Sequence, residues 1–141
     1  MTLTHVFTYG SLMFTNIFEG VTGERCGRQK ATLQQWSRNA LLNKTYPGAM
    51  PSLDPLAQID GVLWLQVSDK ALKNLDIFEG DDYSREWVTV LTENGTSQNA
   101  WVYRWIEESL LCGAWDAAAF ARRHQEDFVA NHWQKPKEST P

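Results

Sequence analysis

Two runs rich in β-branched and aromatic residues, Trp87-Val88-Thr89-Val90-Leu91 and Ala100-Trp101-Val102-Tyr103-Arg104-Trp105, flank the segment Glu93-Asn94-Gly95-Thr96. An Asn-Gly pair between two such runs is a strong signal for a β-hairpin, because both residues tolerate the left-handed backbone of a tight turn. The sequence therefore predicts an antiparallel pair of strands over residues 87–91 and 100–105.

Three further β-rich runs precede this hairpin. Residues 5–9 form a strand that stops at Gly10, residues 31–36 form a second run followed by a loop around Tyr46-Pro47-Gly48, and residues 58–67 form a third. In the third run, simple alternation places Leu63, Leu65 and Val67 on one face, and Val62 and Trp64 on the other.

Two helices are predicted. Ser68 can cap a helix that carries Leu72 and Leu75 on one face and ends before Gly80, and an alanine-rich helix covers about residues 116–132. Helices and strands do not alternate along the chain, which argues against a Rossmann-type layout. We expect an α+β domain with a curled or closed, mostly antiparallel sheet.

Length and composition restrict the classes of protein that remain. The 141 residues fit one domain, here placed at residues 1–134, with residues 135–141 as a flexible tail. A net charge of −4 argues against nucleic acid and anionic membrane as partners. No segment approaches the roughly 20 apolar residues that span a membrane, and we expect a cytoplasmic protein. The three histidines are scattered, so we expect no metal site, and the two cysteines lack CxxC spacing, which leaves a disulfide framework unsupported.

The segment Leu75-Asp76-Ile77-Phe78-Glu79-Gly80-Asp81-Asp82-Tyr83-Ser84-Arg85 concentrates acidic residues at the end of a predicted helix, where the helix dipole disfavours negative charge. A broken local rule of this kind is more frequent at functional sites. Glu79 shares the face of Leu72 and Leu75, so we expect it to point inward, with a pKa raised by burial and by neighbouring acids. The spacing agrees equally well with a structural carboxylate that pairs with Arg85.

A second candidate segment is Tyr9-Gly10-Ser11-Leu12, at the point where the first strand becomes a loop. A glycine with positive φ would let successive N–H groups face one anion, although an ordinary strand-ending turn fits the same residues. Ser11 lies in no Gly-x-Ser-x-Gly elbow and has no histidine at motif spacing, so we discount it as a nucleophile.

Together, Val6-Phe7-Thr8-Tyr9-Gly10-Ser11-Leu12 and the acidic segment at residues 75–85 resemble the gamma-glutamylcyclotransferase-like family. This family includes bacterial members, animal gamma-glutamylamine cyclotransferases and plant avirulence-induced proteins. Its pattern is Tyr-Gly-Ser/Thr-Leu, a Tyr-Pro loop, and Asp-x-x-Glu-Gly followed by Tyr and Arg. Tyr46-Pro47 and the strand that bears Tyr103 occur in the expected order, and the resemblance covers about residues 4–107.

The resemblance implies a fold and a site. The fold would be a small mixed, mostly antiparallel β-barrel with flanking helices, and a cavity would place the Tyr9–Leu12 loop opposite Glu79. Glu79 would be the acid and base, and the loop amides of Tyr9, Gly10, Ser11 and Leu12 would hold a glutamyl α-carboxylate. Tyr83, Arg85 and Tyr103 would support the site by orienting Glu79 or walling the cavity, although Arg85 could equally pair with Asp82 on the surface.

The resemblance also implies a cofactor-independent enzyme, a monomer or weak homodimer, that cyclises a small gamma-glutamyl amide to 5-oxoproline and releases an amine. Two alternatives stay open. One is a non-catalytic domain on the same barrel that binds a small molecule or a protein, for which Trp87, Trp101 and Trp105 could line a binding face. The other is an amide hydrolase, in which water replaces the substrate's α-amine.

Overall fold

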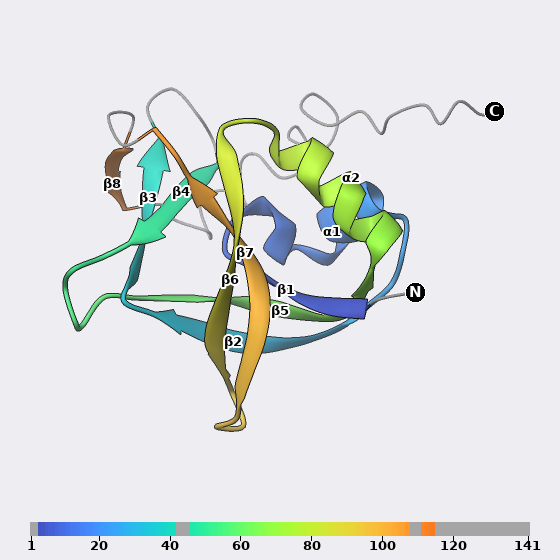
Figure 1. The fold of residues 1–141 in the computed structure, drawn as a ribbon, viewed down its shortest axis with the longest axis horizontal. Coiled ribbons are helices and arrows are strands. Elements are labelled where there is room, and N and C mark those ends of the chain that lie inside the picture. The colour runs from blue at the N-terminus through green and yellow to red at the C-terminus, as the bar shows by residue number, and fades with distance from the viewer. Residues whose placement is uncertain (1–2, 42–45, 108–110, 115–141) are drawn as a thin grey trace.

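The computed structural model describes residues 3–41, 46–107 and 111–114, and its centre is a closed β-barrel. The barrel strands follow one another in the order β1 (Leu3–Thr8), β5 (Gln58–Ser68), β2 (Gly27–Gln34), β6 (Tyr83–Thr92) and β7 (Ser97–Trp105) (Figure 1). Neighbouring strands are antiparallel, except that β1 and β7 close the barrel in parallel through Val6 and Trp101. The predicted mixed, mostly antiparallel barrel with flanking helices is confirmed.

A small second sheet lies beside the barrel and has the strand order β4 (Pro47–Pro51), β3 (Trp36–Leu41), β8 (Leu111–Ala114). The prediction of one strand over residues 31–36 is wrong, because Gln35 has a φ of 62° and divides the run between the two sheets. The prediction of a loop at residues 46–48 is also wrong, because strand β4 already begins at Pro47. Prolines at both ends of β4 are tolerated because this strand forms an edge of its sheet.

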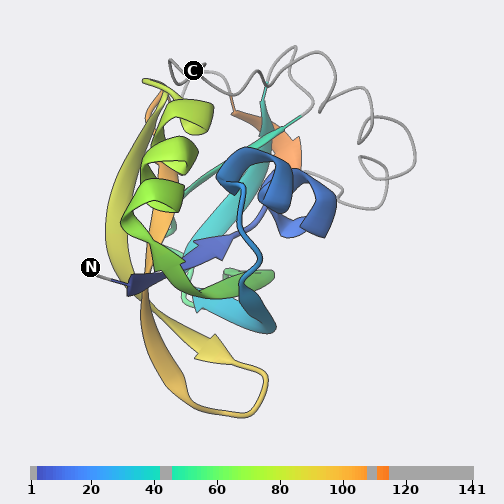
Figure 2. The same ribbon diagram turned by 90° about the vertical axis from the view of Figure 1, so that its right-hand side faces the viewer.

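The short 3₁₀ helix η1 (Ser11–Met13) and the helices α1 (Thr15–Thr22) and α2 (Asp69–Glu79) flank the barrel. In two perpendicular views α1 and α2 lie side by side (Figures 1 and 2). The predicted boundaries of α2 are confirmed, since the Ser68 hydroxyl accepts a hydrogen bond from the Ala71 N–H and Gly80 follows with a φ of 77°. Helix α1 was not predicted, because its sequence contains Gly20 and several β-branched residues, which are weak helix formers.

Burial explains both α1 and a local change in β5. Ile17, Phe18 and Val21 of α1 are buried in one core cluster with Trp64, and the Phe18 and Trp64 rings stack at 3.9 Å between centroids. Val67 also belongs to this cluster and not to the one that contains Leu63. The predicted face of Val67 is therefore wrong. Gln66, with a φ of 54°, interrupts the alternation along β5.

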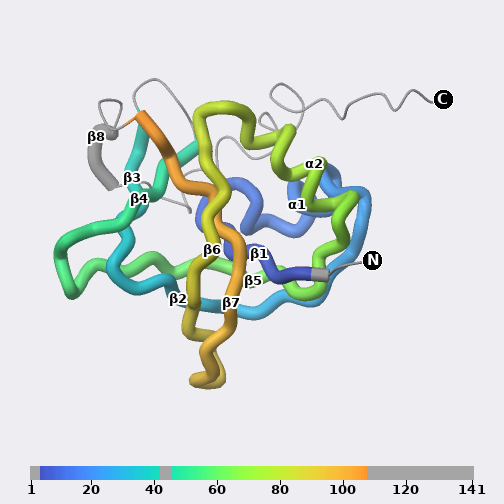
Figure 3. Tube along the Cα trace, viewed as in Figure 1, coloured from blue at the N-terminus to red at the C-terminus, as the bar shows by residue number. Residues whose placement is uncertain are grey.

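The trace in Figure 3 shows the feature that matters for the site: the chain leaves β1 and turns directly into η1 and α1, beside α2. The ends of β1 and α2, far apart in sequence, thus lie on the same side of the barrel. None of the helices that the structure describes is long and apolar enough to cross a membrane. The predicted helix at residues 116–132, the domain boundary at 134 and the tail at 135–141 lie outside the described residues.

Candidate active site

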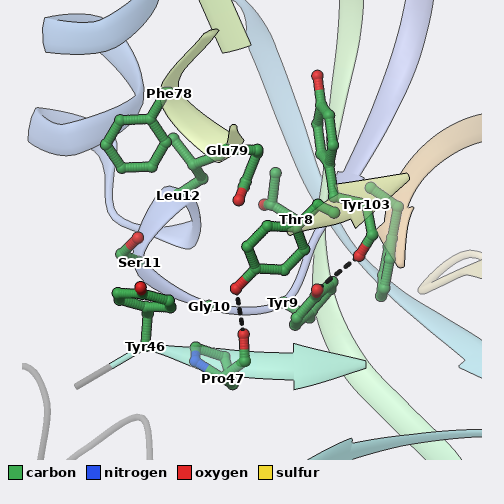
Figure 4. A pocket seen from close by; sticks show the side chains of 12 residues that line it. Thr8, Tyr9, Gly10, Ser11, Leu12, Tyr46, Pro47, Phe78, Glu79 and Tyr103 are labelled. Atoms are coloured by element: carbon green, nitrogen blue, oxygen red, sulfur yellow. Dashed lines mark hydrogen bonds between the residues drawn. The ribbon is translucent and has the colours of Figure 1, made fainter. Parts of the chain in front are cut away.

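A cavity of about 140 Å³ lies where the end of β1 meets the end of α2 (Figure 4). The structure brings Glu79 and all four residues of the Tyr9–Leu12 turn into its wall. Among the residues that the structure describes, the lining consists of Phe7, Thr8, Tyr9, Gly10, Ser11, Leu12, Tyr46, Pro47, Phe78, Glu79, Tyr83 and Tyr103. Glu79 is the sole carboxylate among these described residues, and the remaining side chains are aromatic, aliphatic or hydroxyl-bearing.

The Tyr9–Leu12 turn is fixed through its carbonyl oxygens. The Tyr9 carbonyl accepts from Arg38 Nη1 at 2.9 Å, and the Leu12 carbonyl accepts from Trp64 Nε1 at 3.1 Å. The carbonyls of Gly10 and Ser11 accept from the N–H groups of the 3₁₀ turn that follows.

The same turn leaves its donors available. The N–H groups of Gly10, Ser11 and Leu12 have no acceptor among the residues that the structure describes. A turn with engaged carbonyls and available N–H groups is suited to an anion, because free backbone donors stabilise negative charge.

Gly10 is required for a different reason from the one predicted. Its φ is −132°, so the expectation of a positive φ is wrong. A Cβ atom at this position would lie 2.8 Å from both Cγ and Cδ of Pro47, closer than such atoms can approach. Glycine thus lets the turn lie directly against β4.

Glu79 is the last residue of α2, and Leu75 one turn earlier is fully buried. The Glu79 side chain is half-buried and points into the cavity (Figure 4). Burial, and to a smaller extent the charge of Asp76, raise the pKa of Glu79 from 4.5 to about 8. No hydrogen bond or ion pair joins its carboxyl group to another described residue, so this group is free to exchange a proton with a bound molecule near neutral pH.

Tyr9, Tyr83 and Tyr103 lie in the cavity wall and are themselves held by hydrogen bonds. Tyr9 donates its hydroxyl proton to the Tyr103 carbonyl at 2.5 Å, and Tyr83 donates to the Pro47 carbonyl at 2.6 Å (Figure 4). The Tyr103 hydroxyl leads out of the cavity to Asp76 Oδ1, at 2.7 Å. Burial raises the pKa of all three phenols, so these side chains stay neutral.

Arg85 does not line the cavity and is paired neither with Glu79 nor with Asp82. Its Nε atom lies 3.6 Å from Asp76 Oδ1, and its guanidinium group stacks 4.5 Å above the Trp101 ring. The sequence analysis assigned no role to Asp76 and so missed a residue that contacts two of the predicted supporting residues, Tyr103 and Arg85. The signal available in the sequence was the position of Asp76, three residues and so about one helical turn before Glu79. In the structure its side chain faces β6 and β7.

The described part of the chain contains no group of three His, Cys, Asp or Glu side chains arranged to hold a metal ion.

Comparison with known proteins identifies the family. The family model described as "Gamma-glutamyl cyclotransferase, AIG2-like" matches residues 6–125, most of the chain. The chain belongs to this family. The cavity described above therefore lies in an AIG2-like gamma-glutamyl cyclotransferase fold, and the matched range includes both the Tyr9–Leu12 turn and Glu79.

Individual relatives agree with this membership. The chain is 27% identical to AIG2-like protein D of Arabidopsis thaliana over 133 residues, which cover 92% of this chain and 86% of the relative. A solution structure of an Arabidopsis thaliana protein, also 27% identical, superposes with a TM-score of 0.72 over 92% of this chain and 88% of the other. A solved gamma-glutamyl cyclotransferase, 16% identical, has a TM-score of 0.65 over 99% and 93% of the two chains, which shows a shared fold.

Proposed function

We propose that this AIG2-like family member is an enzyme that cyclises a gamma-glutamyl amide to 5-oxoproline and releases a free amine, with Glu79 as general base and then general acid. The observation that carries the proposal is the composition of one cavity wall. It combines a single carboxylate of raised pKa with a turn whose N–H groups are available to an anion. These two features match the two charged groups of a glutamyl substrate, the α-ammonium and the α-carboxylate.

The reaction needs no nucleophile from the protein. The substrate's α-nitrogen attacks its own γ-carbonyl carbon and closes a five-membered ring, and the bond from that carbon to the leaving nitrogen then breaks. The α-ammonium loses two protons in total, and the leaving nitrogen gains two to depart as an ammonium ion. Well-oriented intramolecular reactions reach effective molarities of roughly 10⁵–10⁸ M, equivalent to about 7–11 kcal/mol of barrier. Folding the substrate into this geometry is thus the main task of the cavity.

Glu79 supplies the proton transfers. An ammonium group that enters the cavity stabilises the charged carboxylate and lowers the pKa of Glu79 toward neutrality. The raised pKa of Glu79 lies closer to that of the substrate's ammonium group than an ordinary carboxyl value of 4.5 does, so proton transfer from the ammonium to the carboxylate costs less free energy. The same carboxyl group then lies in position to return the proton to the leaving nitrogen.

The Tyr9–Leu12 turn would hold the α-carboxylate at its three N–H groups. Tyr83 and Tyr103 serve as cavity walls, and their neutral phenols leave Glu79 as the sole charged side chain among the described residues of the lining. The tryptophans give little support to the alternative of a non-catalytic binding domain. Trp105 is buried, and the half-exposed Trp87 packs edge-on against Trp101.

The decisive experiment is incubation of the purified protein with a panel of gamma-glutamyl amides, which differ in the amine that they release. We expect 5-oxoproline and the free amine in equal amounts from at least one of them, and no glutamate. Glutamate as the product would instead identify a hydrolase. Binding without any turnover across the panel would favour the non-catalytic alternative.

A further inference from the structure

Outside the cavity, the end of α2 is tied to the β6–β7 hairpin by a single carboxylate. Asp76 Oδ1 accepts a hydrogen bond from the Tyr103 hydroxyl at 2.7 Å and lies 3.6 Å from Arg85 Nε. Arg85 is itself held over the Trp101 ring. Asp76 therefore joins the last turn of α2 to β6, the strand that follows this helix in the chain, and to β7, the partner of β6 in the hairpin.

The partners of Asp76 also reach the other side of the cavity. Tyr103 contacts α2 with its hydroxyl, while its carbonyl accepts the hydroxyl proton of Tyr9. A continuous chain of two hydrogen bonds thus runs from the Tyr9–Leu12 turn, through Tyr103, to the helix turn that ends in Glu79. The carbonyl of Asp76 adds a further link, because it accepts the N–H of Gly80 at 3.0 Å, directly after Glu79.

We propose that Asp76 is a positioning residue for Glu79: it fixes the last turn of α2 against Tyr103 and Arg85, so that the Glu79 carboxyl group is held in the cavity opposite the Tyr9–Leu12 turn. This inference rests on the proposed function, in which Glu79 moves protons. It adds that Asp76, which is not among the described residues that line the cavity, sets both the place and the proton affinity of the reacting carboxyl group.

Charges around Glu79 support an electrostatic part of this role. Tyr9, Tyr46, Tyr83 and Tyr103 face the cavity from the other elements. Burial raises the pKa of Tyr9, Tyr83 and Tyr103, so these three phenols carry no charge near neutral pH. The charge of Arg38 lowers the pKa of Tyr9, and the charge of Asp82 raises the pKa of Tyr83. The pKa of Glu79 itself is raised mainly by burial and to a smaller extent by the charge of Asp76. Arg85, as the ion-pair partner of Asp76, opposes the effect of the Asp76 charge.

Two substitutions should therefore move the titration of Glu79 in opposite directions. Asp76→Asn keeps an oxygen acceptor for Tyr103 but removes the negative charge, so the pKa of Glu79 should fall. Arg85→Gln leaves the charge of Asp76 without its cation, so the pKa of Glu79 should rise. Both values are measured by carbon-13 NMR titration of the side-chain carboxyl groups, with the Glu79 resonance assigned by its loss in Glu79→Gln.

A matched control is available on the same hairpin. Glu86 pairs with Arg104 at 3.2 Å and is about as exposed as Asp76, at 36% against 41% of the side chain. Glu86→Gln changes the net charge by the same amount as Asp76→Asn, but the ion pair that it removes lies within the hairpin, so it should leave both the titration of Glu79 and the activity unchanged. An equal shift in this control, or no shift in Asp76→Asn, would overturn the proposal.

Tyr103→Phe separates geometry from charge. It deletes the hydrogen bond to Asp76 but keeps both charges, so the titration of Glu79 should move little. The amide of Gly80 should exchange faster with deuterium, and kcat should fall about tenfold to 100-fold with a smaller change in KM, because a displaced reacting group is costly. Unchanged amide exchange and an unchanged kcat would contradict the positioning role. The NMR titrations and the exchange rates need no turnover, so failure of the proposed reaction across all amides would be distinguished from failure of this inference.

Discussion

The ring of Pro47 packs against Gly10 so closely that no side chain fits between them, since a Cβ atom at Gly10 would lie 2.8 Å from two of the ring carbons. Pro47 opens β4, and its carbonyl accepts a hydrogen bond from Tyr83, so it is itself fixed between the second sheet and the barrel. The Tyr9–Leu12 turn therefore takes its position from β4. The site depends on a contact between segments that are far apart in the sequence.

Gly10→Ala tests this contact. The added methyl group must displace either the turn or Pro47, so we expect a lower Tm and a kcat/KM that falls mainly through a higher KM. Ser11→Ala is the matched comparison, because it removes a hydroxyl without touching the backbone, and the loss should be at most about the 0.5–1.5 kcal/mol of one ordinary hydrogen bond. Steady-state kinetics and thermal melts of both variants provide the measurement.

These two variants also test the anion-binding role of the turn. A folded Gly10→Ala protein with normal kcat/KM would rule out a dependence on the close contact with Pro47. Loss of turnover in a folded Ser11→Ala protein would show that the hydroxyl takes part directly, and serine chemistry would then have to be reconsidered.

Glu79→Gln should keep the fold and abolish turnover. An amide has nearly the same shape as the carboxyl group, but it cannot accept the proton of the substrate ammonium. Circular dichroism and the release of 5-oxoproline from the best substrate of the panel measure the two properties. Activity within about tenfold of the native protein would remove Glu79 from the mechanism, because general acid–base catalysis typically contributes about 10²–10⁴-fold.

The raised pKa of Glu79 also predicts how stability depends on pH. The folded protein binds the carboxyl proton more tightly than the unfolded chain, with a pKa of about 8 against an ordinary value of 4.5. The contribution of Glu79 to the free energy of unfolding is therefore complete below about pH 4.5, declines as pH rises to about 8, and is constant above. In Glu79→Gln this dependence is absent.

The measurement is the difference in Tm between Glu79→Gln and the native protein across pH 5 to 9, in which all other titrating groups largely cancel. The Tm of Glu79→Gln should rise relative to the Tm of the native protein as pH rises, and this difference should level off above about pH 8. A constant difference over this range would mean that the carboxyl group titrates near its ordinary pKa.

Much of this fold could be predicted because its signals are local. The Asn94-Gly95 turn, the Ser68 cap and Gly80 after α2 each depend on residues within a few positions. Placement of Glu79 on the face of Leu75 followed from helical spacing in the same way. The catalytic and binding roles of the site residues came from resemblance to a family and stay predictions.

The features that sequence reasoning missed depend on distant partners. Helix α1 is stabilised by the burial of Phe18 against Trp64 and not by its own helix propensity. The β-rich run is interrupted at Gln35 because the residues before and after it belong to two different sheets. Pro47 is part of a strand only because β3 lies beside it. Asp76 was missed for the same reason, since its partners Tyr103 and Arg85 come from two strands that follow in the chain.

The last prediction concerns the nucleophile, which separates a cyclising enzyme from a hydrolase on the same barrel. If the substrate's own α-nitrogen attacks, acetylation of that nitrogen removes its lone pair from reaction, and the N-acetylated amide should bind without being turned over. An α-deamino analogue, which has no nitrogen to attack, should be equally inert, whereas a water-dependent enzyme would cleave at least one of the two.

The reaction is followed by release of the amine, with product identity established by mass spectrometry in water enriched in oxygen-18. A cyclisation incorporates no heavy oxygen into 5-oxoproline during the single turnover, because no water is consumed. Heavy oxygen in a glutamate product would instead place water at the γ-carbonyl and require a different role for the cavity, with Glu79 activating that water rather than the substrate's ammonium group.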